Sequence, residues 1–202
     1  MRIGVMGGTF DPIHLGHLRA AEEIYLAFGL DRIIFVPAAR PPHKDAGDVA
    51  APIHRYEMVS LATIFTPYFT VSPIELNRPG TSYRELLHLA QVIVTARPGW
   101  RLDEVETALA PEQRAALGHP TFKYLRISEV GLQLARTPPV PGLVLLVEVV
   151  SLDISSREIR QLVEEGRSVR FLVPDTVAAY VQKNRLYQRR AGRRKEDNPH
   201  RG

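Results

Sequence analysis

The residues best suited to chemistry form one glycine-rich segment that ends in two histidines, Gly7-Gly8-Thr9-Phe10-Asp11-Pro12-Ile13-His14-Leu15-Gly16-His17. The two glycines let the backbone approach a ligand closely, and the helix expected after them points its positive N-terminal end at the same space. His14 and His17 are three residues apart, so both side chains fall on one face of the first helical turn, and Gly16 leaves room for a ligand. The pattern predicts a phosphate-binding site. The structural alternative is a tight turn from strand to helix with incidental histidines.

The segments on either side of this loop predict a strand, a helix and a second strand. Residues 2–6 form a short apolar run that indicates a buried strand. From residue 15 to about 28 apolar residues recur at helical spacing, and Gly29 is placed to end that helix. The continuous apolar run of 33–37 is typical of a central strand in a parallel sheet. This order is a βαβ unit, whose connection is expected to be right-handed.

The rest of the chain continues the alternation. Helices are expected over 54–65, 101–118, 155–165 and 176–184, and strands over 69–76, 92–96 and 143–150. This order predicts an α/β fold, a Rossmann-like doubly wound parallel sheet with helices on both faces, whose ligands lie at the carboxyl ends of the strands. We expect one domain over 1–188. Residues 189–202 lack apolar periodicity and are expected to form a disordered basic tail.

Composition and charge limit the classes of protein that remain. The 202 residues include no cysteine, which excludes disulfides and thiolate metal sites and fits a reducing compartment. No apolar run approaches the roughly 20 residues that cross a bilayer, and there is no signal-peptide layout, so we expect a cytoplasmic protein without a membrane partner. The net charge is +4, and residues 189–202 alone hold six basic and two acidic side chains. The excess charge therefore belongs to the tail, and we expect small nucleotides rather than nucleic acid as partners.

Four segments of the chain carry a resemblance to a known family. His14-Leu15-Gly16-His17, with the residues before it, resembles the HxGH signature of the nucleotidylyltransferase superfamily, and most closely that of the bacterial nicotinate-nucleotide adenylyltransferases. Three further segments agree in the expected order: Val36-Pro37 with Pro41-Pro42-His43-Lys44 resembles the basic loop of that family, Ile154-Ser155-Ser156 with Ile159-Arg160 its second phosphate signature, and Val173-Pro174-Asp175 with Leu186-Tyr187 its C-terminal helix.

The resemblance implies a fold of the nucleotidylyltransferase type and transfer of the adenylyl group of ATP to nicotinic acid mononucleotide. The products would be nicotinic acid adenine dinucleotide and pyrophosphate. The attacking group is a phosphate oxygen that is already anionic at neutral pH, so catalysis reduces to alignment and neutralisation of charge. The cofactor would be Mg²⁺, held mainly by phosphates and water, with no metal ligand from the protein.

The resemblance also implies a role for each matching residue. His14 and His17 would stabilise the α-phosphate and the leaving pyrophosphate, and Lys44 would bring a mobile positive charge. Ser155, Ser156 and Arg160 would bind the β- and γ-phosphates. The ATP site would further include Gly7, Gly8, Thr9, Phe10 and Gly16. We also expect a mononucleotide site formed by Thr9, Lys44, Ser82, Tyr83, Arg97 and Trp100, in which Tyr83 and Trp100 can stack on the pyridine ring and Arg97 follows the end of a strand.

Each of these residues also has a structural interpretation. Lys44 lies in a polar loop and, taken alone, would be a solvated charge. The pair Ser155-Ser156 would serve as a helix N-cap, a role that can coexist with phosphate binding, and Arg160 would form a surface salt bridge. The residues assigned to the pyridine side have alternatives in the core or on the surface: Tyr83, Trp100 and Arg97.

The chain departs from the family pattern at three places. Arg157 stands where the second phosphate signature usually has Thr or Ser, and Ala38-Ala39 stands where an Asn is often found. The third departure follows Tyr83, where the pattern continues through a helix, a strand ending in Gly-Ala-Asp and a Trp, whereas Arg84 follows directly here. About 30 residues, one βα unit, are absent, including an Asp near the nicotinate and metal region. Because loss of a central strand would unpair its neighbours, we expect that the printed sequence omits a stretch between Tyr83 and Arg84.

Two other interpretations stay open. One keeps the superfamily and changes the acceptor, as in phosphopantetheine adenylyltransferase or a cytidylyltransferase, whose resemblance to the Pro-Pro-His-Lys loop is weaker. The other is a non-catalytic nucleotide or nucleic-acid binding module, whose affinity would fall steeply with salt and vanish without residues 189–202. The preference for nicotinate over nicotinamide mononucleotide is left open, and so is the oligomeric state, a homo-oligomer included.

Overall fold

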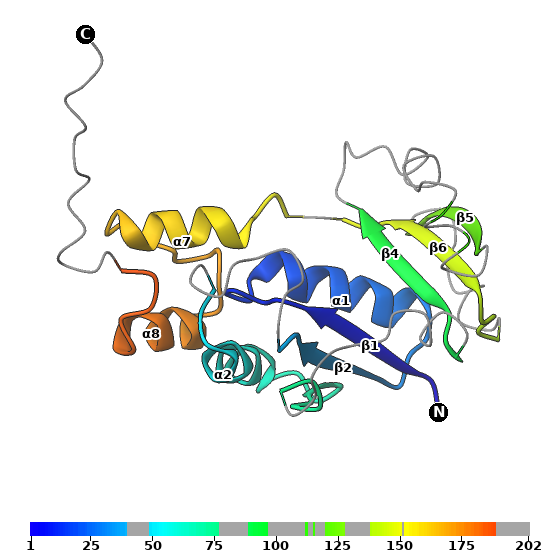
Figure 1. The fold of residues 1–202 in the computed structure, drawn as a ribbon, viewed down its shortest axis with the longest axis horizontal. Coiled ribbons are helices and arrows are strands. Elements are labelled where there is room, and N and C mark those ends of the chain that lie inside the picture. Colours follow the sequence, from blue (N-terminus) through cyan, green and yellow to red (C-terminus); the bar gives the residue numbers. More distant parts are fainter. Residues whose placement is uncertain are drawn as a thin grey trace, which may run out of the picture.

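The protein is an α/β chain whose strands are gathered in two small parallel sheets (Figure 1). The computed structural model describes residues 1–39, 49–76, 89–96, 112, 115, 120–127, 138–150 and 152–188. Each sheet has three strands, in the order β1-β2-β3 in the first and β4-β6-β5 in the second. All neighbouring strands are parallel, so the predicted class, a parallel α/β fold, is confirmed. The described strands nevertheless form two sheets, where one continuous sheet was expected.

The first sheet is built around the βαβ unit expected from the N-terminal sequence. β1 (Ile3–Gly8) pairs with β2 (Arg32–Pro37), and β2 pairs with β3 (Phe69–Val71). β2 is the central strand, as its apolar run predicts, and its residues Ile33 and Phe35 are buried. The carboxyl ends of β1 and β2 point toward the helices α2, α7 and α8 (Figure 1).

The helix between β1 and β2 ends as the sequence predicts. α1 covers Leu15–Ala27, and Gly29 follows its C-terminal cap with a φ of +54°. Glycine adopts this left-handed conformation without strain, so the chain can turn from α1 toward β2.

The second sheet has the last apolar run of the sequence at its centre. β6 (Leu143–Glu148) lies between β4 (Val92–Ala96) and β5 (Thr121–Arg126). Leu145 and Val147 are buried, which confirms the prediction of a central strand. β5 is absent from the sequence-based expectations because this edge strand mixes exposed Thr, Lys and Arg with apolar residues, which hides its apolar pattern.

β1 is an edge strand, so the prediction of a buried strand is wrong. Among the described strands it pairs only with β2, and alternate residues along it are exposed. Ile3 is 44% exposed and Val5 is 68% exposed. Tyr83 and Arg84, between which the family pattern has a further βα unit, lie outside the described residues. Within the described residues, the edge of β1 opposite β2 pairs with no other strand.

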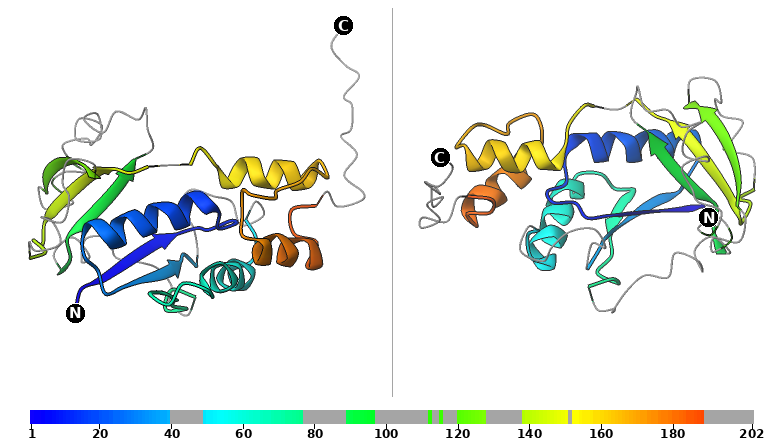
Figure 2. Two further views of the ribbon diagram at one scale, coloured as in Figure 1. Left: turned by 180° about the vertical axis from the view of Figure 1, so that it is seen from behind. Right: turned by 45° about the horizontal axis from the view of Figure 1, so that its top comes forward.

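α1 contacts the cores of both sheets. Leu18, Ala21 and Tyr25 pack in the core of the first sheet, whereas Ala20 and Ile24 pack against the buried residues of β6. Both views of Figure 2 show α1 running alongside the two sheets. Through this packing α1 connects the two sheets, which in a continuous sheet would be connected by strand pairing.

A buried carboxylate adds a polar link between α1 and the end of β6. Glu23 is 5% exposed, it forms an ion pair with Arg19 one turn earlier, and it accepts the N–H of Val150 at 2.6 Å. Because a buried carboxylate costs free energy unless it is paired, these contacts favour keeping the second sheet against the helix.

The remaining helices agree with the sequence apart from their ends. α2 covers Pro52–Thr63, α7 covers Ser156–Glu164 and α8 covers Asp175–Lys183. The strand expected over 69–76 stops after three residues, because Pro73 has no N–H to donate to a sheet and begins a turn.

Two expected segments fall outside the described residues. These are the tail over 189–202 and nearly all of the helix over 101–118, of which only Glu112 and Ala115 are described, both of them helical. The division into a domain over 1–188 and a tail therefore stays a prediction. In the part of the chain that the structure describes, no helix is both long and apolar enough to cross a membrane.

Candidate active site

The first loop begins at the end of β1 and turns at Phe10. β1 extends through Gly8, and Phe10 then takes a φ of +49°. The ring of Phe10 is buried and covers Gly8, where a Cβ would lie 2.8 Å from it. The ring also meets His17 edge-on, with the two centroids 5.2 Å apart. Phe10, expected at the ATP site, is therefore a core residue whose side chain supports one of the histidines.

The two histidines lie together at the start of α1. His14 is the N-cap residue of the helix, and its backbone N–H donates to Nδ1 of His17 at 3.3 Å. The ring centroids are 3.6 Å apart and the ring planes are tilted by 32°, so the prediction that both side chains share one face is confirmed. His14 is buried and His17 is partly exposed. A ligand approaching this helix end from solvent would meet His17 first.

Gly16 and Gly7 differ in the space beside them. A Cβ on Gly16 would lie 3.1 Å from Nδ1 of His14 and 3.3 Å from the carbonyl oxygen of Leu152. The room expected for a ligand is therefore filled by the chain itself, and the glycine allows the segment before α7 to approach the start of α1. A Cβ on Gly7 would meet nothing within 4 Å, so this glycine faces open space.

The N-terminus of α7 is closed by a capping box, as the serine pair predicts. Oγ of Ser155 accepts the N–H of Glu158 at 3.1 Å and donates to Oε2 of the same glutamate at 2.8 Å. That carboxylate also accepts the N–H of Ser155 at 3.2 Å. The hydroxyl group expected to bind a phosphate thus donates its hydrogen bond to Glu158. The negative charge of this glutamate lies at the helix end that attracts anions.

Two other residues of the second phosphate signature fasten α7 to the first loop. Oγ of Ser156 donates to the carbonyl oxygen of Pro12 at 2.9 Å. Nη1 of Arg160 donates to the carbonyl oxygen of Asp11 at 2.7 Å and lies 3.4 Å from its carboxylate. The structure therefore brings the two signatures together, as the resemblance implies, but it uses these donors to join the two segments.

Asp11, which the sequence patterns do not single out, is a buried carboxylate in the first loop. It is 1% exposed, and its Oδ1 accepts the N–H of Ala50 at 3.1 Å and the hydroxyl of Tyr187 at 2.8 Å. Together with Arg160, these contacts bring three other segments of the chain to one aspartate.

Arg55 in α2 is a second residue that the sequence patterns miss. It is 1% exposed, and its guanidinium donates to three main-chain carbonyl oxygens, those of Thr9 at 2.9 Å, Ala50 at 3.0 Å and Ala39 at 3.2 Å. Burial lowers the pKa of Arg55, and the negative charge of Asp11 opposes this shift. Thr9, expected to contact both nucleotides, is thus fixed through its carbonyl group by a residue outside the predicted site.

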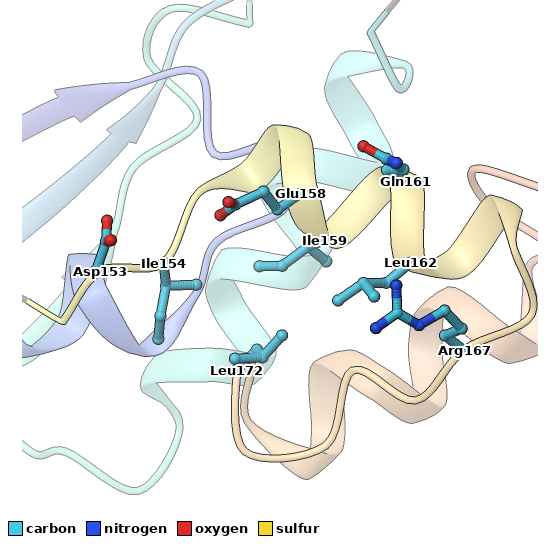
Figure 3. Close-up of a pocket in the computed structure, with 8 residues that line it drawn as sticks. All are labelled: Asp153, Ile154, Glu158, Ile159, Gln161, Leu162, Arg167 and Leu172. Carbon is cyan, nitrogen blue, oxygen red and sulfur yellow. The ribbon is translucent and has the colours of Figure 1, made fainter.

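A cavity of about 300 Å³ lies against α7 (Figure 3). Its lining residues come from the segment before α7, from the helix and from the segment after it: Asp153, Ile154, Glu158, Ile159, Gln161, Leu162, Arg167 and Leu172. The cavity adjoins the start of α1, because the carbonyl oxygen of Leu172 accepts the N–H of Leu15 at 2.9 Å. Its mixture of branched apolar side chains and a few charged groups suits a partly apolar ring better than a phosphate chain.

Five of the predicted site residues lie outside the described residues: Lys44, Ser82, Tyr83, Arg97 and Trp100. Their roles stay predictions. Among the residues that the structure does describe, no group of three or more His, Cys, Asp or Glu side chains is placed to hold a metal ion.

The chain belongs to the cytidylyltransferase-like family, whose sequence profile matches residues 5–162. Its relatives within this family are named probable nicotinate-nucleotide adenylyltransferases. One from Thermus thermophilus is 42% identical, with 93% of this chain and 100% of the relative covered. Another, from Roseiflexus sp. strain RS-1, is 37% identical, with 92% of this chain and 98% of the relative covered.

A solved structure supports the same fold. The chain is similar to the Plasmodium falciparum nicotinic acid mononucleotide adenylyltransferase complexed with NaAD, with a TM-score of 0.61 over 92% of this chain and 97% of that one. The two sequences are 16% identical, so this similarity concerns the fold alone.

The length of the Thermus comparison bears on the missing βα unit. It runs over 207 aligned positions, more than the 202 residues of the whole chain, although only 93% of this chain takes part. The relative therefore has residues with no counterpart here. This agrees with the gap in the family pattern.

We expect Tyr187 to make the fold sensitive to alkaline pH. Burial, helped by the charge of Asp11, raises the pKa of Tyr187 well above its usual value, so the folded state favours the neutral phenol. The unfolded tyrosine ionises above about pH 10, so this contribution to stability is complete below pH 10 and falls above it, by up to about 1.4 kcal/mol per pH unit.

Tyr187→Phe should remove most of that fall in the free energy of unfolding between about pH 10 and 11.5, measured by urea titration. Tyr124→Phe, at an exposed position in β5, is the matched control and should leave the fall unchanged. If the free energy of unfolding falls equally steeply with pH in wild type and Tyr187→Phe, Tyr187 is not the source of the alkaline sensitivity.

Proposed function

We propose that the protein transfers the adenylyl group of ATP to nicotinic acid mononucleotide, giving nicotinic acid adenine dinucleotide and pyrophosphate. The proposal rests on one observation: the first loop brings the adjacent histidines His14 and His17 together with the start of α7. Relatives named for this activity, 37% and 42% identical over more than nine-tenths of the chain, support the choice of acceptor. The partners would be these two nucleotides, and the place of action the cytoplasm.

The reaction needs no base from the protein. A phosphate oxygen of the mononucleotide attacks the α-phosphorus of ATP, the bond from that phosphorus to the oxygen bridging to the β-phosphate breaks, and pyrophosphate leaves. At neutral pH most of the mononucleotide phosphate is the dianion, because the second pKa of a phosphate monoester is about 6. The protein therefore supplies alignment and positive charge.

His17 is the described residue best placed to stabilise the α-phosphate. Its Nδ1 accepts the backbone N–H of His14, so the neutral ring carries its proton on Nε2 and can donate it to a phosphate oxygen. His14 and Phe10 hold the ring from two sides. Gly7 faces open space, which lets a phosphate approach the backbone of the first loop.

Two further cations would complete the triphosphate site. Lys44 belongs to the segment outside the described residues, and its role rests on the resemblance. Arg157 is exposed on the first turn of α7, where it adds positive charge in place of the hydroxyl group usual in the family. The hydroxyl groups of Ser155 and Ser156 would contribute to phosphate binding only after their hydrogen bonds to Glu158 and to the carbonyl oxygen of Pro12 are broken.

Mg²⁺ would enter with the phosphates of ATP. The donors described around the first loop fit this, because they are imidazole, hydroxyl and guanidinium groups, and the carboxylate of Asp11 is buried and engaged by Ala50 and Tyr187. Once bound, the ion would neutralise charge on the triphosphate.

If the βα unit absent between Tyr83 and Arg84 is a true deletion, it affects the acceptor side more than the ATP side. The histidine pair and α7 are present and in contact through the first loop. Tyr83 borders the gap in the family pattern, and the other residues expected at the pyridine ring are Ser82, Arg97 and Trp100. The acceptor site is therefore where this chain is expected to differ from its relatives.

The proposal is tested by pyrophosphate release from ATP and Mg²⁺ with three acceptors: nicotinic acid mononucleotide, nicotinamide mononucleotide and phosphopantetheine. We expect the highest kcat/KM with nicotinic acid mononucleotide. No turnover with this acceptor contradicts the proposal, and a higher kcat/KM with phosphopantetheine would favour the alternative acceptor instead.

His17→Ala should lower kcat by about 100-fold or more, because one donor aimed at the transition-state charge is lost. The matched control is His54→Ala, which removes a histidine whose Nδ1 is bonded to the hydroxyl of Tyr180 between α2 and α8. This control is expected to lower the melting temperature and to keep kcat. Equal kcat values for His17→Ala and wild type would contradict the role of His17 in stabilising the α-phosphate.

Glu158→Gln should improve the binding of ATP. Glutamine can keep the capping box at the start of α7 but removes the negative charge next to the triphosphate. We expect KM for ATP to fall about threefold, the effect of one unit charge some 6 Å away in a water-like dielectric. Glu165→Gln, at the other end of α7, is the control and should leave KM unchanged. A higher KM for ATP in Glu158→Gln would mean that the carboxylate assists binding.

A further inference from the structure

We propose that Arg55 is a positioning residue for adenylyl transfer, which sets the place of the first loop, and through it of His17, without touching substrate. The inference rests on the proposed function, although part of its test is independent of activity. Arg55 lies in the first turn of α2, and no motif of the sequence includes it.

The guanidinium of Arg55 joins three segments that are far apart in the sequence. Its Nη1 donates to Thr9 in the first loop, at 2.9 Å. Its Nη2 donates to Ala39 just after β2, at 3.2 Å, and its Nε to Ala50 just before α2, at 3.0 Å. A planar fork of N–H donors fits three fixed carbonyl groups in a way that the single ammonium group of lysine cannot.

Burial excludes a direct role in binding nucleotides. Arg55 is 1% exposed, so a phosphate cannot reach its guanidinium without opening the structure. A buried cation is stable only when its donors are satisfied, and here three carbonyl dipoles and the nearby charge of Asp11 do this. The residue is thus committed to holding the backbone.

Two further hydrogen bonds, both donated by backbone N–H groups, join the same segments to the first loop. The N–H of Ala38 donates to the carbonyl oxygen of Gly8 at 2.8 Å, and the N–H of Ala50 donates to Oδ1 of Asp11 at 3.1 Å. Three successive contacts therefore hold the first loop: Ala38 bonds to residue 8, Arg55 to residue 9 and Ala50 to residue 11. Phe10, between them, carries the ring that packs against His17.

The expected consequence is a loss of alignment. If Thr9 is released, Phe10 and the edge of His17 can shift, while the charges around the triphosphate stay the same. A displacement of about 1 Å at a reacting centre costs on the order of 100-fold in rate. We therefore expect Arg55→Lys, which keeps the charge, to lower kcat about 100-fold and to change KM for ATP less than threefold.

The test compares wild type, Arg55→Lys and a control, Arg126→Lys, at the exposed ion pair between β5 and β6. Steady-state kinetics give kcat and KM for each nucleotide. Backbone amide exchange at Ala38 and Ala50 reports the two hydrogen bonds to the first loop, and exchange in β6 reports the rest of the fold. In Arg55→Lys we expect exchange at least 10-fold faster at Ala38 and Ala50 and unchanged in β6, and in Arg126→Lys neither exchange at these amides nor kcat should change.

Three results would overturn the inference: wild-type kcat in Arg55→Lys, a lowered kcat with unchanged exchange at Ala38 and Ala50, or a KM for ATP raised more than kcat is lowered. If wild type itself shows no turnover with nicotinic acid mononucleotide, the proposed function fails, and the exchange comparison still decides whether Arg55 holds the loop. If Arg55→Lys does not fold, the Nε–H resonance of Arg55 in wild type replaces it. That signal should exchange slowly and shift when an unreactive ATP analogue with Mg²⁺ binds, and the absence of a shift overturns the inference.

Discussion

The burial of one carboxylate in the first loop is the constraint on which the arrangement of the site depends. Asp11 is 1% exposed, and a buried carboxylate without partners would cost several kcal/mol. Its partners come from the start of α2, from α7 and from the C-terminal segment, where Tyr187 lies 176 positions farther along the chain. Movement of any one of these segments removes a partner from the buried carboxylate. The loop at the carboxyl end of β1 therefore has a fixed place before any ligand is present.

The contacts that hold the first loop also limit which donors at the start of α7 are available to phosphates. A motif alone suggests that two serine hydroxyl groups and an arginine are available to phosphates. In the structure Ser156 and Arg160 bind the backbone of the first loop, and Ser155 binds Glu158. Under the proposed function, phosphates would then meet mainly the N–H groups of two helix starts, His17, the exposed Arg157 and Lys44, with the negative charge of Glu158 opposing them.

Local patterns in the sequence predicted local structure well. The βαβ unit, the capping box at Ser155 and the shared face of His14 and His17 all depend on spacings of a few residues. Contacts across the chain were not predictable in this way. Arg55 meets Thr9 over 46 positions, although its position on α2, three residues before buried Met58, does indicate an inward face.

The burial of whole strands was harder to predict, because it depends on which strand lies next to which. The apolar run of β1 indicates a buried strand, yet β1 is at an open edge in the described part of the fold, with Val5 68% exposed. The pattern of β5 predicts no strand because Phe122 and Leu125 lie on opposite faces among exposed Thr, Lys and Arg side chains. The sequence pattern shows which residues are apolar, but whether they are buried depends on the strands and helices that pack next to them.

The position of α1 between two separate sheets has a consequence for cooperativity. No described strand of one sheet pairs with a strand of the other, and the described contacts between the sheets include side chains of α1, Leu30 after it, and the hydrogen bond of Glu23 with Val150. Coupling by side-chain packing rather than by strand pairing lowers the cooperativity expected of unfolding. A single melting temperature would then average over the loss of both sheets.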